Sequence, residues 1–311
     1  MAKRLRHFGP YTIEISNPEK LFFPDSDLTK GDLIEYYEQI APVMLPHLRD
    51  RLVTMHRFPD GIKGEDFYQK DVPDYFPAWI KTVTVEKEEG YLVQLVIQNT
   101  ASLVYLANQA CITLHVWPSR VDRRHHPDRM IFDLDPSGED FGAVREAARA
   151  LRSVLAEVGL LAFVMTTGSR GLHVTVPLDR RSDFTAVRGF ATQVAELVVG
   201  RNPQRFTTQQ PKNKRHGRVF LDVLRNAYAQ HAVAPYAVRA QPGAPVATPI
   251  GWEELDDHTV HARSYTMRNL FRRLGQKEDP WKDMARHARA LTHPRRRLQA
   301  LLDSDKNEQG K

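Results

Sequence analysis

Two aspartates one residue apart, Asp133 and Asp135, end an otherwise apolar run over residues 130–134. In an extended strand alternate side chains share a face, so we expect both carboxylates to project together while the apolar residues face the core. Two carboxylates held on one buried strand are unfavourable unless a cation lies between them. Hard divalent cations such as Mg²⁺ take oxygen ligands. The pair therefore predicts a metal site, against the alternative of ordinary carboxylates at a strand end.

A third carboxylate strengthens this prediction. The spacing of Asp133 and Asp135 is not specific by itself, because Asp25-Ser-Asp27 and Asp303-Ser-Asp305 have the same spacing. Those two segments lack the flanking apolar strand and amphipathic helix. Asp222 lies inside a second apolar strand, where a buried carboxylate needs a partner. Three acidic ligands are enough for a two-metal site in which one carboxylate bridges.

Two further segments could bind anions. The loop over residues 167–171 contains two glycines, Ser169 and Arg170, and can turn backbone N–H groups toward an anion, although most Gly-Ser loops only turn the chain. Lys30 follows a capping-box-like entry at Thr29, in a helix turn whose backbone donors favour an anion. Together with Lys20 on the preceding turn it could grip a phosphate, but two solvated lysines would explain the pattern equally.

Aromatic residues cluster between residues 67 and 79, with lysines beside them. Aromatic side chains interleaved with cations can stack bases and neutralise phosphates. Such residues more often belong to the core, so both interpretations stay open from the pattern alone.

The elements that must position these residues follow from periodicity. Strands are predicted at residues 11–16, 51–58, 67–70, 79–85, 91–97, 112–117, 161–166, 172–177 and 219–224, besides the strand of the aspartate pair. Helices are predicted from residue 29 to 44 and at 101–110, 141–158 and 184–199, with a helical region at 252–302 and a disordered tail at 303–311. The fold class is therefore α/β (α+β).

Composition limits the class of protein. The chain has 311 residues, 41% of them hydrophobic, which is ordinary for a soluble globular protein. Its single cysteine, Cys111, excludes an internal disulfide framework and a Cys-rich zinc site. No apolar run approaches the length of a membrane span and no signal peptide is evident, so a cytoplasmic protein without a membrane partner is expected.

The net charge of +6 fits a polyanionic partner without requiring one. Its distribution is more informative, because five basic clusters make nucleic acid the most economical partner, although a solvated face would explain any one of them. These clusters lie at residues 3–6, 120–126, 212–218, 263–273 and 295–297.

Taken together, these segments resemble one known family, the polymerase domain of bacterial DNA ligase D, which belongs to the archaeo-eukaryotic primase superfamily and serves non-homologous end joining. The similarity runs in the same order from about Ser16 to Leu255. Its motifs are Phe132-Asp-Leu-Asp135-Pro, Thr167-Gly-Ser-Arg-Gly-Leu-His173, Val219-Phe-Leu-Asp222, Val233-Ala-Pro-Tyr236 and Pro242-Gly-Ala-Pro245-Val.

The resemblance implies roles for individual residues. The metal-binding, catalytic carboxylates would be Asp133, Asp135 and Asp222. The residues that bind the nucleotide would be His115, Ser169, Arg170, Gly171, His173 and Arg239. A DNA 5′-phosphate would be bound by Asn17, Lys20 and Lys30, and Phe67 and Tyr68 would stack against the template strand.

The resemblance also implies the architecture: a primase-polymerase fold with a central mixed or antiparallel catalytic sheet flanked by helices, plus an N-terminal α/β portion. Residues 1–302 would form one domain of two intimate lobes, with a DNA-end-binding part at about 1–110, a catalytic core at about 111–250 and C-terminal helices at 251–302. No Lys-x-Asp-Gly ligase signature occurs, and the Met1 start and polar tail favour a stand-alone member over an excised domain.

This chain departs from the family pattern at several positions. Arg170 stands where the family commonly has lysine, Tyr68 where phenylalanine is usual, and Ala237 where serine often follows Ala-Pro-Tyr. His231 replaces a residue that is frequently threonine. These differences affect details of nucleotide geometry and not the expected chemistry.

The implied activity is DNA-dependent nucleotidyl transfer, which extends 3′-OH ends and fills short gaps on broken DNA carrying a 5′-phosphate. It would use two Mn²⁺ or Mg²⁺ ions and prefer ribonucleotides over deoxyribonucleotides. Implied partners are double-stranded, gapped or overhanging DNA ends, nucleoside triphosphates, the end-binding protein Ku and a separate ATP-dependent ligase, in the nucleoid of a prokaryote.

Three alternatives remain at this point. A phosphatase of the haloacid dehalogenase type also begins with Asp-x-Asp on a strand and would use Asp133 as its nucleophile, with Thr166 or Thr167 as its second motif. A catalytically silent DNA-end binder would need only the basic clusters. A primase that starts chains without a primer has the same motifs as an end-joining polymerase.

Overall fold

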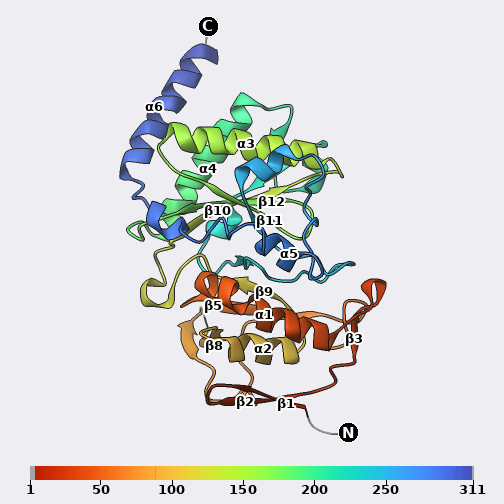
Figure 1. The fold of residues 1–311 in the computed structure, drawn as a ribbon. Helices are drawn as coiled ribbons and strands as arrows, with labels where there is room; N and C mark the ends of the chain where they lie inside the picture. Colours follow the sequence, from red (N-terminus) through yellow and green to blue (C-terminus); the bar gives the residue numbers. More distant parts are fainter. Residues whose placement is uncertain (1–3, 88, 310–311) are drawn as a thin grey trace. The chain divides into compact units, whose positions relative to one another are not determined.

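The computed structural model describes residues 4–87 and 89–309, which form two compact units (Figure 1). Unit 1 comprises Met1–Asp122, His231–Thr248 and Tyr265–Lys277. Unit 2 comprises Arg123–Gln230, Pro249–Ser264 and Glu278–Lys311. Three short segments predicted to belong to the catalytic core or the C-terminal helices, at residues 111–122, 231–248 and 265–277, therefore belong to unit 1.

Unit 1 is built on an antiparallel sheet with the strand order β15-β9-β5-β8-β7, and β6 also pairs with β5. Its strands are β5 (Leu52–Arg57), β6 (Phe67–Gln69), β7 (Thr82–Glu86), β8 (Tyr91–Val96), β9 (Cys111–Val116) and β15 (Ala232–Val233). β7 and β8 form the predicted hairpin, whose tip includes position 88, outside the described residues. All six residues of β9 are buried, so this strand lies in the core of the unit.

Two helices pack together in unit 1: α1 (Lys30–Leu48) and α2 (Thr100–Asn108). α1 begins with the predicted capping box, in which the Thr29 side chain accepts from the Asp32 N–H while Asp32 accepts from the Thr29 N–H. Two short antiparallel pairs complete the N-terminal part, and α5 (Leu270–Leu274) also belongs to this unit. The pairs are β1 (Arg4–Phe8) with β2 (Tyr11–Ile15), and β3 (Leu21–Phe23) with β4 (Leu28–Thr29).

Unit 2 contains a mixed six-stranded sheet with the order β13-β14-β10-β12-β11-β16. Its strands are β10 (Arg129–Asp135), β11 (Phe163–Thr166), β12 (Leu172–Pro177), β13 (Phe206–Thr207), β14 (Val219–Asp222) and β16 (Pro249–Ile250). All neighbouring strands are antiparallel except β13 and β14. The two long helices α3 (Phe141–Glu157) and α4 (Phe184–Arg201) pack on each other and on this sheet, and Figure 1 shows them along one side of it.

The C-terminal part differs from the continuous helical region predicted for residues 252–302. It contains only short helical turns and α5 before α6 (Thr292–Gln309), because Gly275 and Pro280 interrupt helical periodicity. α6 continues to Gln309, so the predicted disordered tail at 303–311 is wrong over its first seven residues, and residues 310–311 lie outside the described part. Arg201 fixes this helix by donating from Nε to Asp305 Oδ2 at 3.0 Å.

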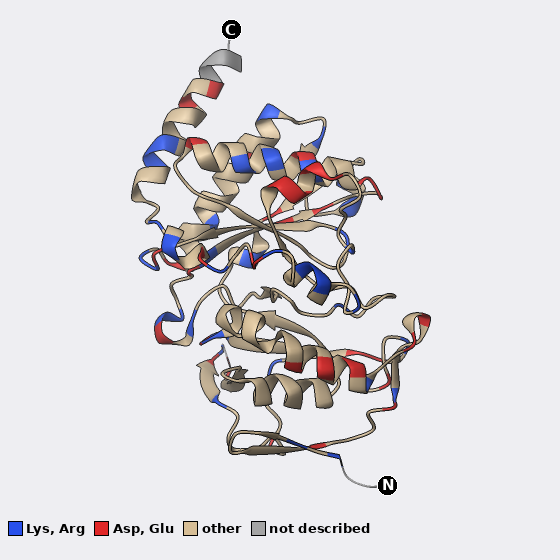
Figure 2. Cartoon of the chain, viewed as in Figure 1, with Lys and Arg blue, Asp and Glu red and all other residues tan. Residues whose placement is uncertain are grey.

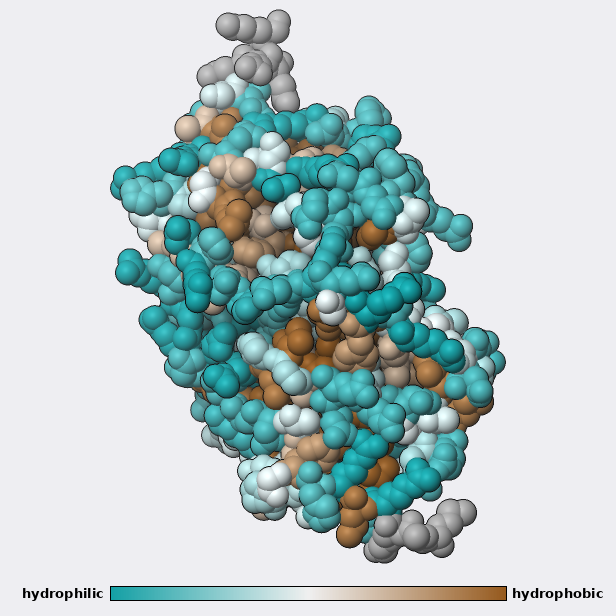
Figure 3. All heavy atoms as spheres, in the orientation of Figure 1, coloured by the Kyte–Doolittle hydropathy of each residue, from teal (hydrophilic) through white to brown (hydrophobic). Residues whose placement is uncertain are grey.

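The α+β fold class predicted from the sequence is confirmed, including the central mixed sheet flanked by helices. In the described part of the chain no helix is long and apolar enough to cross a membrane. The face drawn in Figure 3 is mainly hydrophilic, and Figure 2 shows Lys and Arg distributed over both units.

Candidate active site

Three aspartates and a histidine share one face of the sheet in unit 2. Asp133 on β10 is the Cα partner of Asp222 on β14 and of His173 on β12. Cross-strand partners project on the same face, and Asp135 shares it because it lies two residues further along β10. The strand register therefore brings together four residues that are up to 89 positions apart in the sequence.

Asp133 is the best-compensated carboxylate of this group. It is buried, with His173 Nε2 at 3.4 Å from its Oδ1 and Arg225 Nε at 3.5 Å from its Oδ2. Burial opposes ionisation, but the two neighbouring side chains outweigh it and hold the pKa of Asp133 well below its usual range. Asp133 is therefore a stable anion.

The other two carboxyl groups are shifted in the opposite direction. Burial raises the pKa of Asp135, and the adjacent Asp133 carboxylate raises it further. Burial also raises the pKa of Asp222; the Leu224 N–H, 2.7 Å from Oδ1, acts against this, and Asp133 adds to it. Burial and the Asp133 charge therefore disfavour ionisation of Asp135 and Asp222, while neighbouring cations act in the opposite direction.

This donor set fits a divalent cation. A dication beside three carboxylates would remove the repulsion that raises two of their pKa values. In residues 4–87 and 89–309, no three His, Cys, Asp or Glu side chains by themselves form a metal-binding group. An ion here would need other oxygen ligands, such as water or substrate phosphates, as is usual for Mg²⁺.

The loop after β11 is held closed by Thr167. Its hydroxyl donates to the Gly171 carbonyl at 3.0 Å and accepts from the N–H groups of Ser169 and Gly171, at 3.3 and 3.2 Å. A Cβ on Gly171 would lie 1.9 Å from the Leu134 carbonyl oxygen, so only glycine lets the loop approach β10 this closely. Two of the N–H groups expected to face an anion are thus already used inside the loop.

Arg170 in this loop and His173 just after it, on β12, affect the ionisation of the nearby aspartates. Arg170 donates to the Pro136 carbonyl at 3.1 Å, and both side chains favour ionisation of Asp135. The side chain of His173 lies on the carboxylate face, and it is buried. The positive groups predicted to bind an anion therefore lie beside the predicted metal ligands.

Two arginines of this site were not singled out from the sequence. Arg215 lies with its guanidinium carbon 4.1 Å from the Phe220 ring centroid and favours ionisation of Asp135 and Asp222. Arg225 contacts Asp133 directly. From the sequence, Arg215 was recognised only as part of a basic cluster. Arg225 could have been found from its position, because it follows Asp222 by three residues.

The three residues predicted to bind a 5′-phosphate meet in unit 1. Asn17 begins a turn closed by the Lys20 N–H, and the Lys20 carbonyl accepts from the Lys30 N–H at 2.8 Å. Lys30 Nζ donates to the carbonyl and hydroxyl oxygens of Ser16, at 2.6 and 2.9 Å. Burial, then the charges of Lys20 and Arg57, lower the pKa of Lys30 to about 8. This cluster is short of negative charge, as an anion site should be.

One acidic side chain does reach this cluster. Asp60 Oδ1 lies 2.5 Å from Lys20 Nζ, and both side chains are exposed to solvent. An anion that bound Lys20 would have to compete with this carboxylate.

The two predicted stacking residues lie on β6 in unit 1 and are exposed, Phe67 by 44% and Tyr68 by 55%. Arg57 lies over the Phe67 ring at 5.5 Å. His56, the cross-strand partner of Tyr68, stacks on it at 4.0 Å and contacts Asp66 at 2.5 Å. Exposed rings fixed in this way are available for further stacking on their outer faces.

The remaining two predicted nucleotide-binding residues also belong to unit 1. His115 is buried on β9, with its ring 5.6 Å from Tyr68 and 5.1 Å from His231. Arg239 follows β15, and its N–H donates to the Pro245 carbonyl at 2.7 Å. The predicted nucleotide-binding set is therefore divided between the two units.

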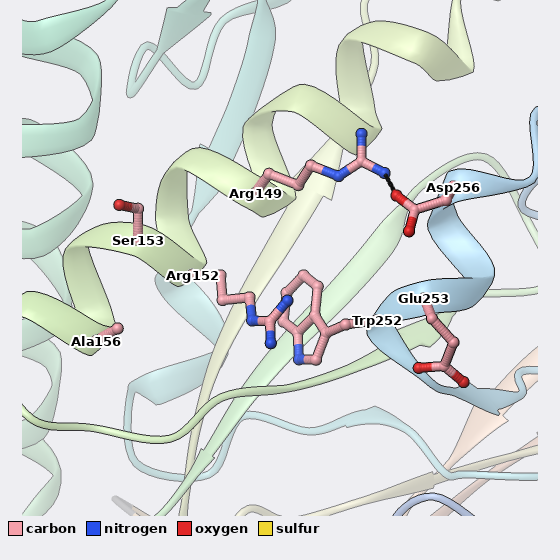
Figure 4. A pocket seen from close by; sticks show the side chains of 7 residues that line it. All are labelled: Arg149, Arg152, Ser153, Ala156, Trp252, Glu253 and Asp256. Carbon is pink, nitrogen blue, oxygen red and sulfur yellow. Dashed lines mark hydrogen bonds and ion pairs between the residues drawn. The ribbon is translucent and has the colours of Figure 1, made fainter.

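A separate pocket of about 560 Å³ lies between α3 and the helical turn at residues 252–256. Arg149 pairs there with Asp256, and the Arg152 guanidinium lies 4.7 Å from the Trp252 ring centroid (Figure 4). Ser153, Ala156 and Glu253 complete the lining. No residue predicted to act in catalysis or binding contributes to this pocket.

Comparison with known sequences gives a consistent result. The family model described as LigD, primase-polymerase domain, matches residues 29–281. The multifunctional non-homologous end joining protein LigD of Pseudomonas aeruginosa is 34% identical over 276 residues, covering 88% of this chain and 33% of that protein. The bifunctional non-homologous end joining protein LigD of Bacillus subtilis is 28% identical over 290 residues, 92% of this chain and 46% of that protein. The chain thus spans a third to a half of these relatives.

A solved structure agrees in fold. The polymerase domain of Mycobacterium tuberculosis ligase D, in complex with DNA, superposes with a TM-score of 0.84 at 31% identity. The match covers 89% of this chain and 99% of that domain.

Proposed function

The chain belongs to the LigD primase-polymerase family, a family of nucleotidyltransferases, and from this premise we propose that it extends DNA 3′-OH ends and fills short gaps in end-joining repair. The observation that carries the proposal is the strand register that sets Asp133, Asp135, Asp222 and His173 on one sheet face.

In the proposed reaction the primer 3′-OH attacks the α-phosphate of a bound nucleoside triphosphate, and pyrophosphate leaves. Asp133, Asp135 and Asp222 would hold two divalent ions, Mn²⁺ or Mg²⁺, which lower the pKa of the attacking hydroxyl and stabilise the leaving oxygen. His173 and Arg225 hold Asp133 ionised and oriented for this task.

The triphosphate would be bound next to these carboxylates. Arg170 and His173, supported by the closed loop that contains Ser169 and Gly171, supply positive and polar groups for the charge that develops in the transition state. His115 and Arg239 of unit 1 would complete the nucleotide site. We attribute the proposed preference for ribonucleotides to these nucleotide-binding residues.

The DNA would be recognised by unit 1. A recessed 5′-phosphate would accept hydrogen bonds from Asn17, Lys20 and Lys30, and its charge would relieve the repulsion that lowers the pKa of Lys30. Phe67 and Tyr68 would stack against the template strand. That a solved relative is in complex with DNA supports DNA binding by this chain. Ku and a separate ATP-dependent ligase are the proposed protein partners.

Primer extension on gapped DNA tests the proposal. We expect extension with Mn²⁺ and Mg²⁺, release of pyrophosphate, faster incorporation of ribonucleotides than deoxyribonucleotides, and tighter binding when the gap carries a 5′-phosphate. Release of inorganic phosphate without extension would instead favour the phosphatase alternative. Synthesis on a template without a primer would favour the primase alternative.

A further inference from the structure

Three aromatic rings form a layered stack from the core of unit 2 to its surface. Phe184, at the start of α4, is buried, and the Tyr228 ring packs edge-on against it at 5.7 Å. The His125 ring lies parallel to Tyr228 at 4.8 Å, with 6° between the ring planes. His125 is exposed and Tyr228 is 38% exposed, so the outermost ring presents a face to solvent. We call these three rings the aromatic stack.

The aromatic stack is fixed to the strand that carries the aspartates. Asn226, two residues before Tyr228, accepts from the Ile131 N–H at 2.8 Å and donates to the Ile131 carbonyl at 2.7 Å. The segment of His125 is held in turn by β12, because the Leu178 N–H donates to the Asp128 carbonyl at 2.9 Å. The stack and the carboxylates thus share one rigid support, β10 with its two neighbouring strands.

Arginines lie in the segments around the aromatic stack. Residues 122–128 and 178–184 carry four arginines and four aspartates, besides His125 and His126. Arg123 and Arg181 are exposed, and of the aspartates Asp179 is paired with Arg181 at 3.2 Å and Asp183 caps α4. A flat ring with arginines at its edge is the arrangement that binds a single nucleic-acid strand through one base and its phosphates.

We propose that the aromatic stack is a second DNA contact, which binds the strand upstream of the 3′ end that the carboxylates act on. This inference rests on the proposed function. A base stacks on the outer face of His125, and Arg123 and Arg181 contact the adjoining phosphates. β10 spans four residues between Arg129 and Asp133, or roughly 13 Å at strand rise, which corresponds to about four nucleotides of a B-form strand.

Fluorescence anisotropy with gapped DNAs tests this contact. The substrates share one template and one 5′-phosphorylated downstream strand, and differ in an upstream strand of two, four, six or eight nucleotides. We expect wild-type affinity to rise once the upstream strand passes about four nucleotides. In the variant His125→Ala/Tyr228→Ala this rise should be lost, which weakens binding of the longest substrate about tenfold.

Two further variants separate stacking from damage to the fold. Tyr228→Phe keeps the stacked ring and should retain the length dependence. Arg123→Glu should flatten the slope of affinity against salt concentration by about one phosphate contact. Arg286→Glu, an equal charge change at an exposed position of unit 2 outside the five basic clusters, should leave that slope unchanged.

Identical length dependence in the wild type and the double variant would overturn the inference, as would equal salt slopes for Arg123→Glu and Arg286→Glu. The proposed function is judged separately, by whether the wild type extends the eight-nucleotide primer at all. Extension with no effect of these variants would refute the second contact and leave the polymerase assignment in place.

Discussion

The proposed phosphate-binding cluster of unit 1 and the carboxylate face of unit 2 have similar electrostatic properties with opposite sign. In unit 1, cationic neighbours and burial lower the pKa of Lys30 to about 8. In unit 2, burial and Asp133 raise the pKa of Asp135. In both sites burial disfavours the charged form, and an external ion of the opposite sign would favour it: a phosphate in the first and a divalent metal in the second.

The two sites differ in how neighbouring groups stabilise the charged side chain. Lys30 has oxygen acceptors from Ser16 and could persist as a neutral amine, whereas Asp133 is held as an anion by His173 and Arg225. Asp133 is therefore held in its charged form, whereas Lys30 can lose its proton as the pH rises through its pKa of about 8. Breaking the first should therefore abolish the reaction, and breaking the second should only change its preference.

The largest effect is expected at Asp135. We predict that Asp135→Ala lowers primer extension at least about 100-fold, because it removes a metal ligand outright and even the loss of a supporting residue costs 10- to 100-fold. Binding of gapped DNA should remain within about twofold of wild type. Asp303→Ala, which removes the first aspartate of another Asp-x-Asp segment, is the control and should extend normally. Extension by Asp135→Ala near the wild-type rate would remove the metal assignment.

A smaller effect is expected at the lysines. Lys20→Ala and Lys30→Met should each reduce the preference for 5′-phosphorylated over unphosphorylated gapped DNA about tenfold, since each removes a charge-assisted hydrogen bond to the phosphate. Equilibrium binding to the two DNAs measures this ratio. Lys63→Ala changes an exposed lysine that pairs with Asp25 and should leave it unaltered. If the ratio survives both cluster variants, the phosphate lies elsewhere.

The pH dependence of the same ratio should sharpen the contrast. Because the pKa of Lys30 in the free protein is about 8, the lysine is charged below that pH and loses its proton as the pH rises through it. We expect the 5′-phosphate preference to fall severalfold between pH 7 and pH 9. Lys30→Arg keeps its charge over this range and should give a flat profile. A profile for wild type as flat as that of Lys30→Arg would contradict the shifted pKa.

The smallest effect is expected at Asp60. Its ion pair with Lys20 is exposed, and such pairs contribute about 0.2–1 kcal/mol. Asp60→Asn should therefore free Lys20 and increase the 5′-phosphate preference by about twofold to fivefold. Asp74→Asn, at an exposed position of the same unit, provides the matched control. Weaker phosphate preference in Asp60→Asn would mean that Asp60 positions Lys20 instead of competing for it.

The sequence was most informative where the determinants are local. The alternation around Asp133 and Asp135, the apolar strand around Asp222 and the Thr29 cap all predicted elements that the structure contains. Register was not predictable, because pairing of β10 with both β12 and β14 depends on contacts between distant segments. Arg215 and Arg225 were missed for the same reason, since only folding places them beside the carboxylates.

In the C-terminal region, the prediction from local sequence patterns was wrong. Its apolar and basic residues suggested continuous helix. Successive segments of this region instead belong to different units, and helix-breaking residues divide it into short turns. The disordered tail was wrong because composition describes an isolated segment. The bond from Arg201 to Asp305 is a tertiary contact that composition does not contain.

The contact between Gly171 and Leu134 has a consequence for how ligands influence one another. Because the loop lies directly against the backbone between Asp133 and Asp135, neither can shift without displacing the other. Binding at the loop and binding at the carboxylates are then thermodynamically linked: whatever factor a triphosphate adds to the affinity for metal, metal must add to the affinity for triphosphate. The two ligands would bind as a cooperative pair.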